Sequence, residues 1–309
     1  MARQKRCRIC KREGFIHLRY ANLPLCKEHF LSRTRSVVQD TIKKFKMFSK
    51  EQKVAVAVSG GKDSLALWHI LSQLGYKTEG IHIELGLGEF SEVSKKISEE
   101  FAEKNGLKLH VFSLKKELGS TIDEIVKKSY EKPCSICGTV KRYMLNKFAY
   151  EISCRVLATG HNLDDESARL MGNILNWEEE YLYRQYPVLP EEEGMVKKVK
   201  PLVFLSRKEL LKYCEAEQIP YVDVSCPHSK GARSLVLVDI MEMIEDRYPA
   251  TKLRFVKGFY KIRERFTPAK KVELRRCVKC GMLTASNKEL CRFCRIKERI
   301  EKDATAKKA

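Results

Sequence analysis

The chain has 309 residues, of which 60 are Lys or Arg and 40 are Asp or Glu, so its formal net charge is +20. This length allows one sizeable hydrophobic core with small appendages. The absence of any run of 18 apolar residues excludes a membrane span, and the basic start MARQKRCRIC lacks the apolar stretch of a signal peptide. These features predict a cytoplasmic protein with no membrane partner.

The positive charge is concentrated at both ends of the chain. Residues 1–50 hold 14 Lys/Arg against 3 Asp/Glu, and residues 252–309 hold 19 against 6. Basic ends on a near-neutral body indicate that the ends bind a polyanion such as nucleic acid. The alternative is a solvated lysine-rich surface, as in many thermophile proteins. The 12 cysteines, in a reducing compartment, indicate metal ligands rather than disulfides.

Two pairs of metal-ligating residues open the chain, Cys7-x2-Cys10 and, fifteen residues later, Cys26-x2-His29. Paired ligands separated by a short hairpin suit a tetrahedral structural zinc, whose binding energy would fold a segment too short for a core of its own. The alternative is four ligands at this spacing by chance. Residues 33–47 then predict a basic helix that links this module to the body.

The stretch VAVAVSGGKDS, residues 54–64, predicts a buried parallel strand, a tight glycine turn and a helix capped by Asp63 or Ser64. Glycines let backbone N–H groups approach a phosphate, and a helix N-terminus favours negative charge. The alternative is an ordinary strand-to-helix connection. The Walker spacing is absent, so this is a different kind of phosphate loop.

Strand and helix patterns alternate beyond this loop. Residues 78–85 and 107–114 predict strands, and residues 91–105 between them predict an amphipathic helix. This order indicates a parallel α/β sheet, whose ligands bind at the carboxyl ends of the strands. His82 and Ile83 approach such an end, where backbone groups near Ile83 are placed to read an adenine. The alternative for His82 is a hydrogen-bonded core histidine.

A second cysteine pair, Cys134-x2-Cys137, lies just before a helix expected over 139–152, whose first turn carries Lys141 and Arg142. Cations are unfavourable at this end of a helix, so an anion is expected nearby. A single CxxC leaves three interpretations open: half of a zinc site, a redox pair, or two ligands of a cluster.

The remaining unpaired cysteines are Cys154, Cys214 and Cys226. Cys154 begins a strand and Cys214 lies on the apolar face of a helix, so both are assigned to the core. Cys226 lies in the loop DVSCPHSKGARS and is the best third ligand, with His228 as a weaker fourth.

Residues 156–167, VLATGHNLDDES, predict another strand, glycine turn and helix start. Gly160 permits close backbone approach, and Asp164 and Asp165 fall in the first helical turn. One of them capping the helix is the structural interpretation. Two carboxylates facing a phosphate site also suit Mg²⁺ binding or proton transfer.

The rest of the chain predicts a surface loop over 178–196, a return strand, a helix capped by Ser206, and two helices within 233–265. The pattern Cys277-x2-Cys280-x10-Cys291-x2-Cys294 then predicts a four-thiolate zinc ribbon. The charged tail after residue 300 is expected to be frayed.

Four segments carry a family resemblance: SGGKDS at 59–64, PCSICG at 133–138, ATGHNLDDE at 158–166 and CPHSKGA at 226–232. In this order, with cysteine modules at both ends, they resemble the PP-loop enzymes that thiolate tRNA. SGGKDSLALW and HIELGLGEFS look most like the 5-methyluridine 2-sulfurtransferases, which act on the T-loop nucleoside. The relatives that act on the wobble uridine are the alternative.

The resemblance implies a Rossmann-like α/β fold with a parallel-sheet PP-loop ATP pyrophosphatase core between two zinc modules. The implied domains are an N-terminal zinc finger (1–32), a catalytic domain with linker helices (33–265) and a C-terminal zinc ribbon with its tail (266–309). ATP would contact Val58, Ser59, Gly60, Gly61, Lys62, Asp63, Ser64, His82, Ile83, Lys141, Gly160 and Asp165.

In the implied reaction, the uridine 2-oxygen attacks the α-phosphorus of ATP, Mg²⁺ neutralises the pyrophosphate, and sulfide displaces AMP. Asp165 would be an essential catalytic acidic residue and Lys141 would position or stabilise phosphate charge. Family members hold a 4Fe-4S cluster on three cysteines, here Cys134, Cys137 and Cys226, with one iron left open to deliver sulfur. Zinc at this site, or a Cys134/Cys137 persulfide route, remains an alternative.

The resemblance also implies two partners, tRNA and a ubiquitin-like sulfur carrier with a C-terminal thiocarboxylate. Two rival classes stay open: a PP-loop enzyme that amidates or attaches lysine, and a non-enzymatic double-zinc RNA-binding scaffold. The basic modules would serve a homodimer as readily as RNA.

Overall fold

The computed structural model describes residues 5–224, 226–228, 233–266, 274–284, 286 and 288–306. A six-stranded sheet lies at its centre in the order β5-β4-β3-β6-β8-β7. The first five strands are parallel, and β7 is antiparallel to β8. The prediction of a parallel α/β sheet is confirmed. Its strands are β3 (Val54–Val58), β4 (Thr78–Glu84), β5 (Lys108–Ser113), β6 (Val156–Ala158), β7 (Val188–Leu189) and β8 (Lys197–Val199).

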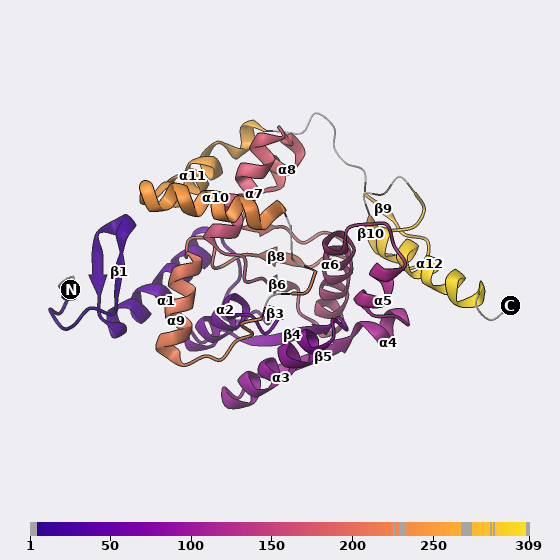
Figure 1. Cartoon of the computed structure of the whole chain (residues 1–309), viewed down its shortest axis with the longest axis horizontal. Helices are drawn as coiled ribbons and strands as arrows, with labels where there is room; N and C mark the ends of the chain where they lie inside the picture. Colours follow the sequence, from indigo (N-terminus) through magenta and orange to yellow (C-terminus); the bar gives the residue numbers. More distant parts are fainter. Residues whose placement is uncertain are drawn as a thin grey trace.

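Helices cover both faces of this sheet (Figure 1). Alternate residues of β3 enter different cores, since Val54, Val56 and Val58 pack into one and Ala55 into the other. The first core is completed by α1 (Lys27–Lys44), α2 (Lys62–Gln73), α3 (Glu89–Lys104) and α9 (Arg207–Glu217). The second is completed by α4 (Leu114–Leu118), α5 (Ile122–Lys127) and α6 (Pro133–Glu151).

A further group of helices packs mainly on α7 (Leu163–Leu175): α8 (Glu179–Arg184), α10 (Arg233–Arg247) and α11 (Thr251–Ile262), which is followed by the 3₁₀ turn η2 (Arg263–Arg265). This group confirms the two helices expected within 233–265. None of the described helices is long and apolar enough to cross a membrane.

The cysteine modules lie at opposite ends of the long axis (Figure 1). The N-terminal module consists of β1 (Ile16–Leu18), η1 (Arg19–Ala21), β2 (Leu23–Leu25) and the start of α1, and it packs with the first core. The C-terminal module consists of β9 (Arg275–Arg276), β10 (Leu283–Thr284) and α12 (Arg292–Ala306), and it packs with the second.

Two expectations about chain segments are wrong. Residues 178–196 are not a plain loop, because α8 and β7 form there and the Leu182 side chain is fully buried. The segment after residue 300 is not frayed from its start, because α12 continues to Ala306. In the first case, burial of Leu182 orders a segment whose local composition is polar.

Candidate active site

The glycine turn predicted at residues 59–61 follows β3 directly. Gly60 has a φ of +73°, and a Cβ there would lie 2.7 Å from the carbonyl oxygen of Ser94, so only glycine fits. The backbone N–H of Ser59 donates to Ser64 Oγ at 3.1 Å, which closes the turn onto α2. The expected cap is wrong: the N-cap residue is Gly61, and no side chain caps α2. Backbone N–H groups of its first turn are therefore available to an anion.

A cavity of about 300 Å³ opens beside this turn. Seven predicted site residues line it: Val58, Ser59, Gly61, His82, Ile83, Lys141 and Cys226. His82 is also the buried core histidine of the alternative interpretation, since its Nδ1 bonds the Val58 carbonyl at 3.1 Å. The prediction that the carboxyl edge of the sheet gathers the candidate site residues agrees with this cavity.

Sequence reasoning missed two walls of the cavity. Ser94 of α3 donates its hydroxyl to the Ser59 carbonyl at 2.6 Å, and the Val222 N–H donates to the Gly60 carbonyl at 2.9 Å. The signal for the first was present, because Ser91, Ser94 and Ser98 recur at helical spacing and all are buried. Small hydroxyl residues on a buried helix face indicate close approach to backbone.

The second glycine turn lies against the first. A Cβ on Gly160 would lie 3.0 Å from the carbonyl carbon of Asp63 and 3.0 Å from the Ser64 nitrogen, so glycine permits this contact. The turn leads into α7, where Asn162 is the N-cap and Asp165 accepts a hydrogen bond from its N–H at 3.1 Å. The structure thus brings Gly160 and Asp165 to the phosphate loop, as predicted.

The two carboxylates nearest the loop suit a divalent cation. Burial raises the pKa of Asp165 to about 6, and the charge of Asp63 adds to this rise. Asp63 Oδ2 pairs with Lys62 Nζ at 2.7 Å, whereas its buried Oδ1 has no hydrogen-bond partner. An orphaned carboxylate oxygen beside a second carboxylate is the hard oxygen environment that Mg²⁺ prefers.

Asp164 does not face the phosphate loop, contrary to the expectation of two carboxylates there. Its Oδ1 lies 2.6 Å from Lys252 Nζ, and its Oδ2 accepts the Arg207 N–H at 2.7 Å. Adjacent residues in a helix point about 100° apart, so one carboxylate enters the site and its neighbour enters the core.

The CxxC pair lies within a helix rather than before it. Helix α6 begins at Pro133, so Cys134 and Cys137 occupy its first turns and Lys141 follows one turn later on the same side. The expectation that Lys141 and Arg142 sit in the first turn is therefore wrong. Proline at the first helical position, where its fixed φ suits the helix and its missing N–H costs nothing, accounts for the earlier beginning.

The three predicted cluster cysteines come together. Burial raises the pKa of Cys137; Cys226 and Cys134 add to the rise, and Lys141 opposes it. The Cys134 thiol lies 3.5 Å from the His228 carbonyl, two residues after Cys226. The His228 Nε2 bonds Asp123 Oδ1 at 2.7 Å, and this pairing gives no support to His228 as a fourth ligand. Residues 229–232 of the CPHSKGA segment lie outside the described residues.

The predicted zinc modules have the geometry of tetrahedral sites. The sulfurs of Cys10 and Cys26 are 3.7 Å apart, and those of Cys280 and Cys291 are 3.8 Å apart. A Zn–S bond of about 2.3 Å requires a sulfur separation of roughly 3.8 Å. Both four-residue groups converge within 4.8 Å, Cys7 with Cys10, Cys26 and His29, and Cys277 with Cys280, Cys291 and Cys294.

The three-cysteine site differs from these modules. Among the described residues, only the two terminal groups converge within 4.8 Å, so Cys134, Cys137 and Cys226 are spread more widely. A wider spacing suits a multi-iron cluster better than one tetrahedral ion.

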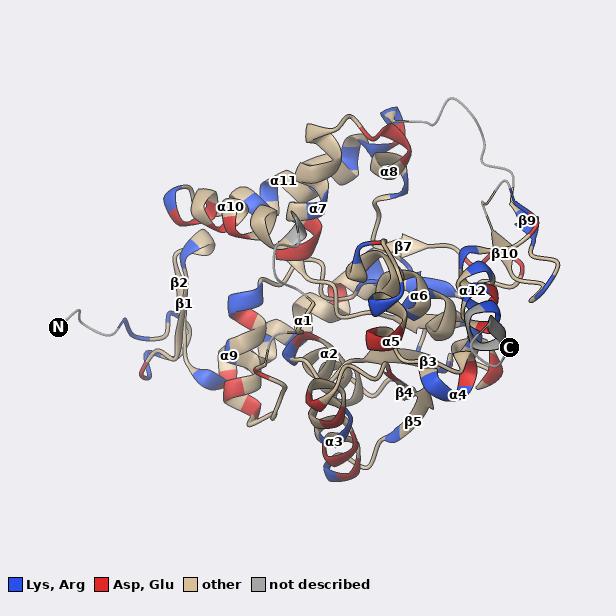
Figure 2. Ribbon diagram, turned by 45° about the vertical axis from the view of Figure 1, so that its right-hand side comes forward, with Lys and Arg blue, Asp and Glu red and all other residues tan. Residues whose placement is uncertain are grey.

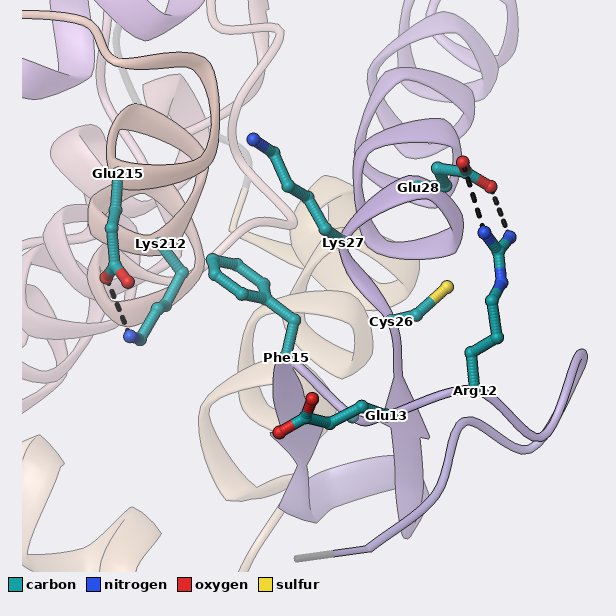
Figure 3. Close-up of a pocket in the computed structure, with 9 residues that line it drawn as sticks. Arg12, Glu13, Phe15, Cys26, Lys27, Glu28, Lys212 and Glu215 are labelled. Atoms are coloured by element: carbon teal, nitrogen blue, oxygen red, sulfur yellow. Dashed lines mark hydrogen bonds and ion pairs between the residues drawn. The ribbon is translucent and has the colours of Figure 1, made fainter.

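A larger hollow of about 630 Å³ lies between the N-terminal module and α9 (Figure 3). An ion pair of Arg12 with Glu28 lies on one side, and Lys212 pairs with Glu215 at 2.6 Å on the other. Lys212 also lies 5.2 Å from the centre of the Phe15 ring. These contacts describe a junction between module and body, and none of the predicted catalytic residues lies there.

Comparison with known proteins identifies the family to which the chain belongs. Residues 53–235 match the phosphoadenosine phosphosulfate reductase domain family, and residues 6–31 match the N-terminal LIM domain of the 2-thiouridine synthetase TtuA. The chain is 43% identical to the tRNA-5-methyluridine(54) 2-sulfurtransferase of Thermus thermophilus, over 98% of this chain and 94% of that protein. The chain belongs to the tRNA-5-methyluridine(54) 2-sulfurtransferase family.

Other members and neighbours of this 2-sulfurtransferase family are consistent with that conclusion. The Pyrococcus horikoshii member is 39% identical over 94% of this chain and 93% of its own length. The U34-tRNA thiolase NcsA from Methanococcus maripaludis, whose structure contains a [4Fe-4S] cluster, superposes with a TM-score of 0.82 at 28% identity, covering 97% of each chain. The full-length fold, including both modules, is therefore shared with a tRNA thiolase.

Proposed function

We propose that the chain is an ATP-dependent tRNA thiolase that converts 5-methyluridine in the tRNA T-loop into 5-methyl-2-thiouridine. The observation that carries this proposal is the cavity at the end of β3. The phosphate turn, Lys141 and Cys226 line the same cavity, so an activated nucleotide and a sulfur-bearing group would meet there.

The first step is adenylylation of the substrate. The uridine 2-oxygen attacks the α-phosphorus of ATP, the bond to the bridging oxygen breaks, and pyrophosphate leaves. The N–H groups at the start of α2 would bind phosphate oxygens, and Asp63 and Asp165 would hold Mg²⁺ against the pyrophosphate. Lys141, which lines the cavity, would offset the charge that develops on the phosphate.

The second step replaces oxygen by sulfur. Sulfide adds to the activated ring carbon, and AMP leaves with the former 2-oxygen. Cys134, Cys137 and Cys226 would hold the cluster, which would supply a binding site for sulfur next to the activated nucleotide. The alternatives of zinc or a Cys134/Cys137 persulfide are less well supported, because the three thiols spread more widely than a single-ion site and a persulfide has no need of Cys226. A thiocarboxylated ubiquitin-like carrier is the sulfur donor in this proposal.

Basic residues beside the site would bind tRNA phosphates. Arg142 lies close enough to Arg169 and to Lys198 for their positive charges to repel each other, and none of the three makes an ion pair within the described part of the chain. Figure 2 shows further Lys and Arg on α6, β9 and α12 towards the C-terminal module. Cations that lack an ion-pair partner favour the binding of a polyanion.

Anaerobic purification of the wild type and a Cys226→Ser variant tests the proposal. The wild type should contain about four irons and two zincs per chain, and the variant should lose iron and keep zinc. Zinc without iron under strictly anaerobic conditions would overturn the cluster assignment. Release of AMP and pyrophosphate only when tRNA is present would exclude the RNA-binding scaffold.

The nucleoside position needs its own experiment. One tRNA would keep the T-loop uridine and carry cytidine at the wobble position, and a second would have the reverse arrangement. Thiolation of the first alone is expected, because the 2-sulfurtransferase relatives share 39–43% identity with the chain and the U34 thiolase shares 28%. Thiolation of the second alone would move the assignment to the wobble uridine.

A further inference from the structure

The two CxxC segments on opposite sides of one interface touch through the residues between their cysteines. Arg292 lies between Cys291 and Cys294 of the C-terminal module, and Ser135 lies between Cys134 and Cys137. The Arg292 Nη2 donates a hydrogen bond to Ser135 Oγ at 3.0 Å. A side chain held between two zinc ligands therefore contacts the turn that carries two cluster ligands.

Glu131 extends this contact to the start of α6. Its carboxylate accepts hydrogen bonds from Arg292 and from Arg299, the latter at 2.8 Å. Both arginines belong to α12, and Glu131 lies two residues before the first residue of α6. The hydrogen bonds from Arg299 and Arg292 lower the pKa of Glu131, so the carboxylate is charged at neutral pH.

Apolar contacts join the same two elements. The ring of Phe293, the other residue between Cys291 and Cys294, stacks on Tyr143 of α6 at 3.8 Å and an interplanar angle of 6°. Ile136, between the cluster cysteines, and Ile296 of α12 are buried in one core. A stacked ring pair and shared burial make this interface part of the hydrophobic core rather than a surface contact.

The zinc ligands determine where Arg292 and Phe293 lie. A module with two-residue strands and one helix cannot bury a core of its own, so its folding depends on the bound metal. Metal binding at Cys291 and Cys294 sets the backbone between them, and that backbone presents Arg292 to Ser135 and Phe293 to Tyr143.

We infer that the C-terminal zinc module is a structural part of the three-cysteine site, with Arg292 as a positioning residue that holds the turn Cys134–Cys137 for its ligand. This inference rests on the proposed function for the identity of that ligand. The module would then have two roles, RNA binding and support of the three-cysteine site. Zinc loading and retention of the cluster would be coupled through α6.

Arg292→Met tests the inference, with Lys279→Met as the matched control. Lys279 also belongs to the module, but it pairs with Glu298 and Glu301 of α12 and not with α6. Both variants and the wild type would be purified anaerobically, and iron loss to a chelator would be followed by visible absorbance. Partners that orient metal ligands change metal affinity by about 10–100-fold, so Arg292→Met should lose iron about tenfold faster than the control.

Glu131→Gln provides the same test from the other side, outside the zinc module. It should accelerate iron loss while zinc content stays at the wild-type value, so a damaged zinc site cannot explain the result. Iron loss at the wild-type rate in both Arg292→Met and Glu131→Gln would overturn the inference.

If the wild type binds no iron, the cluster assignment is overturned, but the positioning role of Arg292 can still be tested by hydrogen exchange. In protein that holds zinc but no cluster, Arg292→Met should raise amide exchange over residues 134–138, and Lys279→Met should not. Equal exchange in the two variants would refute the positioning role independently of iron.

Discussion

Lys252 Nζ lies 2.6 Å from Asp164 Oδ1, and both side chains are almost completely buried. The carboxylate beside Asp165 in the sequence therefore belongs to an ion pair between α7 and α11. Glu242 of α10 binds the same ammonium group, so one lysine joins three helices. These helices support the turn that presents Asp165 to the phosphate loop.

The adjacent aspartates are expected to give opposite phenotypes. Asp164→Asn leaves Lys252 with Glu242 as its remaining charged partner and should lower the free energy of unfolding by about 1–3 kcal/mol. Asp165→Asn should keep stability within about 1 kcal/mol, because an amide oxygen can still accept the Asn162 N–H, while thiolation falls roughly 100-fold or more. Urea unfolding and tRNA thiolation assays measure the two effects. Normal turnover by Asp165→Asn would remove this residue from the mechanism.

Gly160→Ala should weaken ATP binding. Its new Cβ would lie 3.0 Å from backbone atoms of Asp63 and Ser64, which must move and thereby displace the first turn of α2. Overpacking of this kind costs about 1–3 kcal/mol. Gly258→Ala in α11 is the control, because no atom lies within 4 Å of its added Cβ. Calorimetric titration with a non-hydrolysable ATP analogue should show weaker binding for Gly160→Ala only.

Replacing Cys277 and Cys280 by Ser should weaken tRNA binding and leave ATP binding intact. The change would remove two ligands of the zinc proposed to fold the basic C-terminal module. Several of its cations should then no longer reach phosphates, and affinity should fall on the order of tenfold at low salt. A gel shift and an ATP titration separate the two effects. Unchanged tRNA affinity would show that this module does not hold the RNA.

The double variant Arg169→Gln/Lys198→Gln should reduce the salt dependence of tRNA binding. Removing one cation from a phosphate lowers the slope of log affinity against log salt by about 0.7–0.9, so the double substitution should lower it by about 1.5. Lys96→Gln is the control, since Lys96 lies on α3 and pairs with Glu100. An unchanged slope in the double variant would exclude these two cations from the RNA interface.

His82 makes the fold sensitive to acid. Burial lowers its pKa to about 4, below the value of about 6.5 expected in the unfolded chain. The unfolded state therefore binds the proton first, and stability falls as the pH drops from 6.5 towards 4, by about 2 kcal/mol at pH 5. His82→Asn keeps a donor for the Val58 carbonyl and should reduce the loss between pH 7 and 5 by about that amount. Equal pH slopes in both proteins would contradict this account.

Local sequence patterns were sufficient to predict the fold class, the phosphate turn and the terminal modules. VAVAV is apolar at every position because both faces of a central parallel strand are buried, and SGGKDS supplies the turn where that strand ends. The paired cysteine spacings predict the terminal groups because each pair lies within a few residues. The spacing of nearby cysteines and the period of apolar residues can be read directly from the amino-acid sequence.

Only the tertiary structure decided which of the two adjacent aspartates faces the phosphate loop and what the terminal cysteine modules contact. Asp164 and Asp165 have the same local environment in sequence, and only the distant Lys252 separates their roles. Cys226 lies near Cys134 and Cys137 because its loop returns across the phosphate turn, where the Val222 N–H donates to the Gly60 carbonyl. The contact of Arg292 with Ser135 joins residues 157 positions apart. No local pattern encodes such pairs, because they form only when packed helices fix the distance between remote segments.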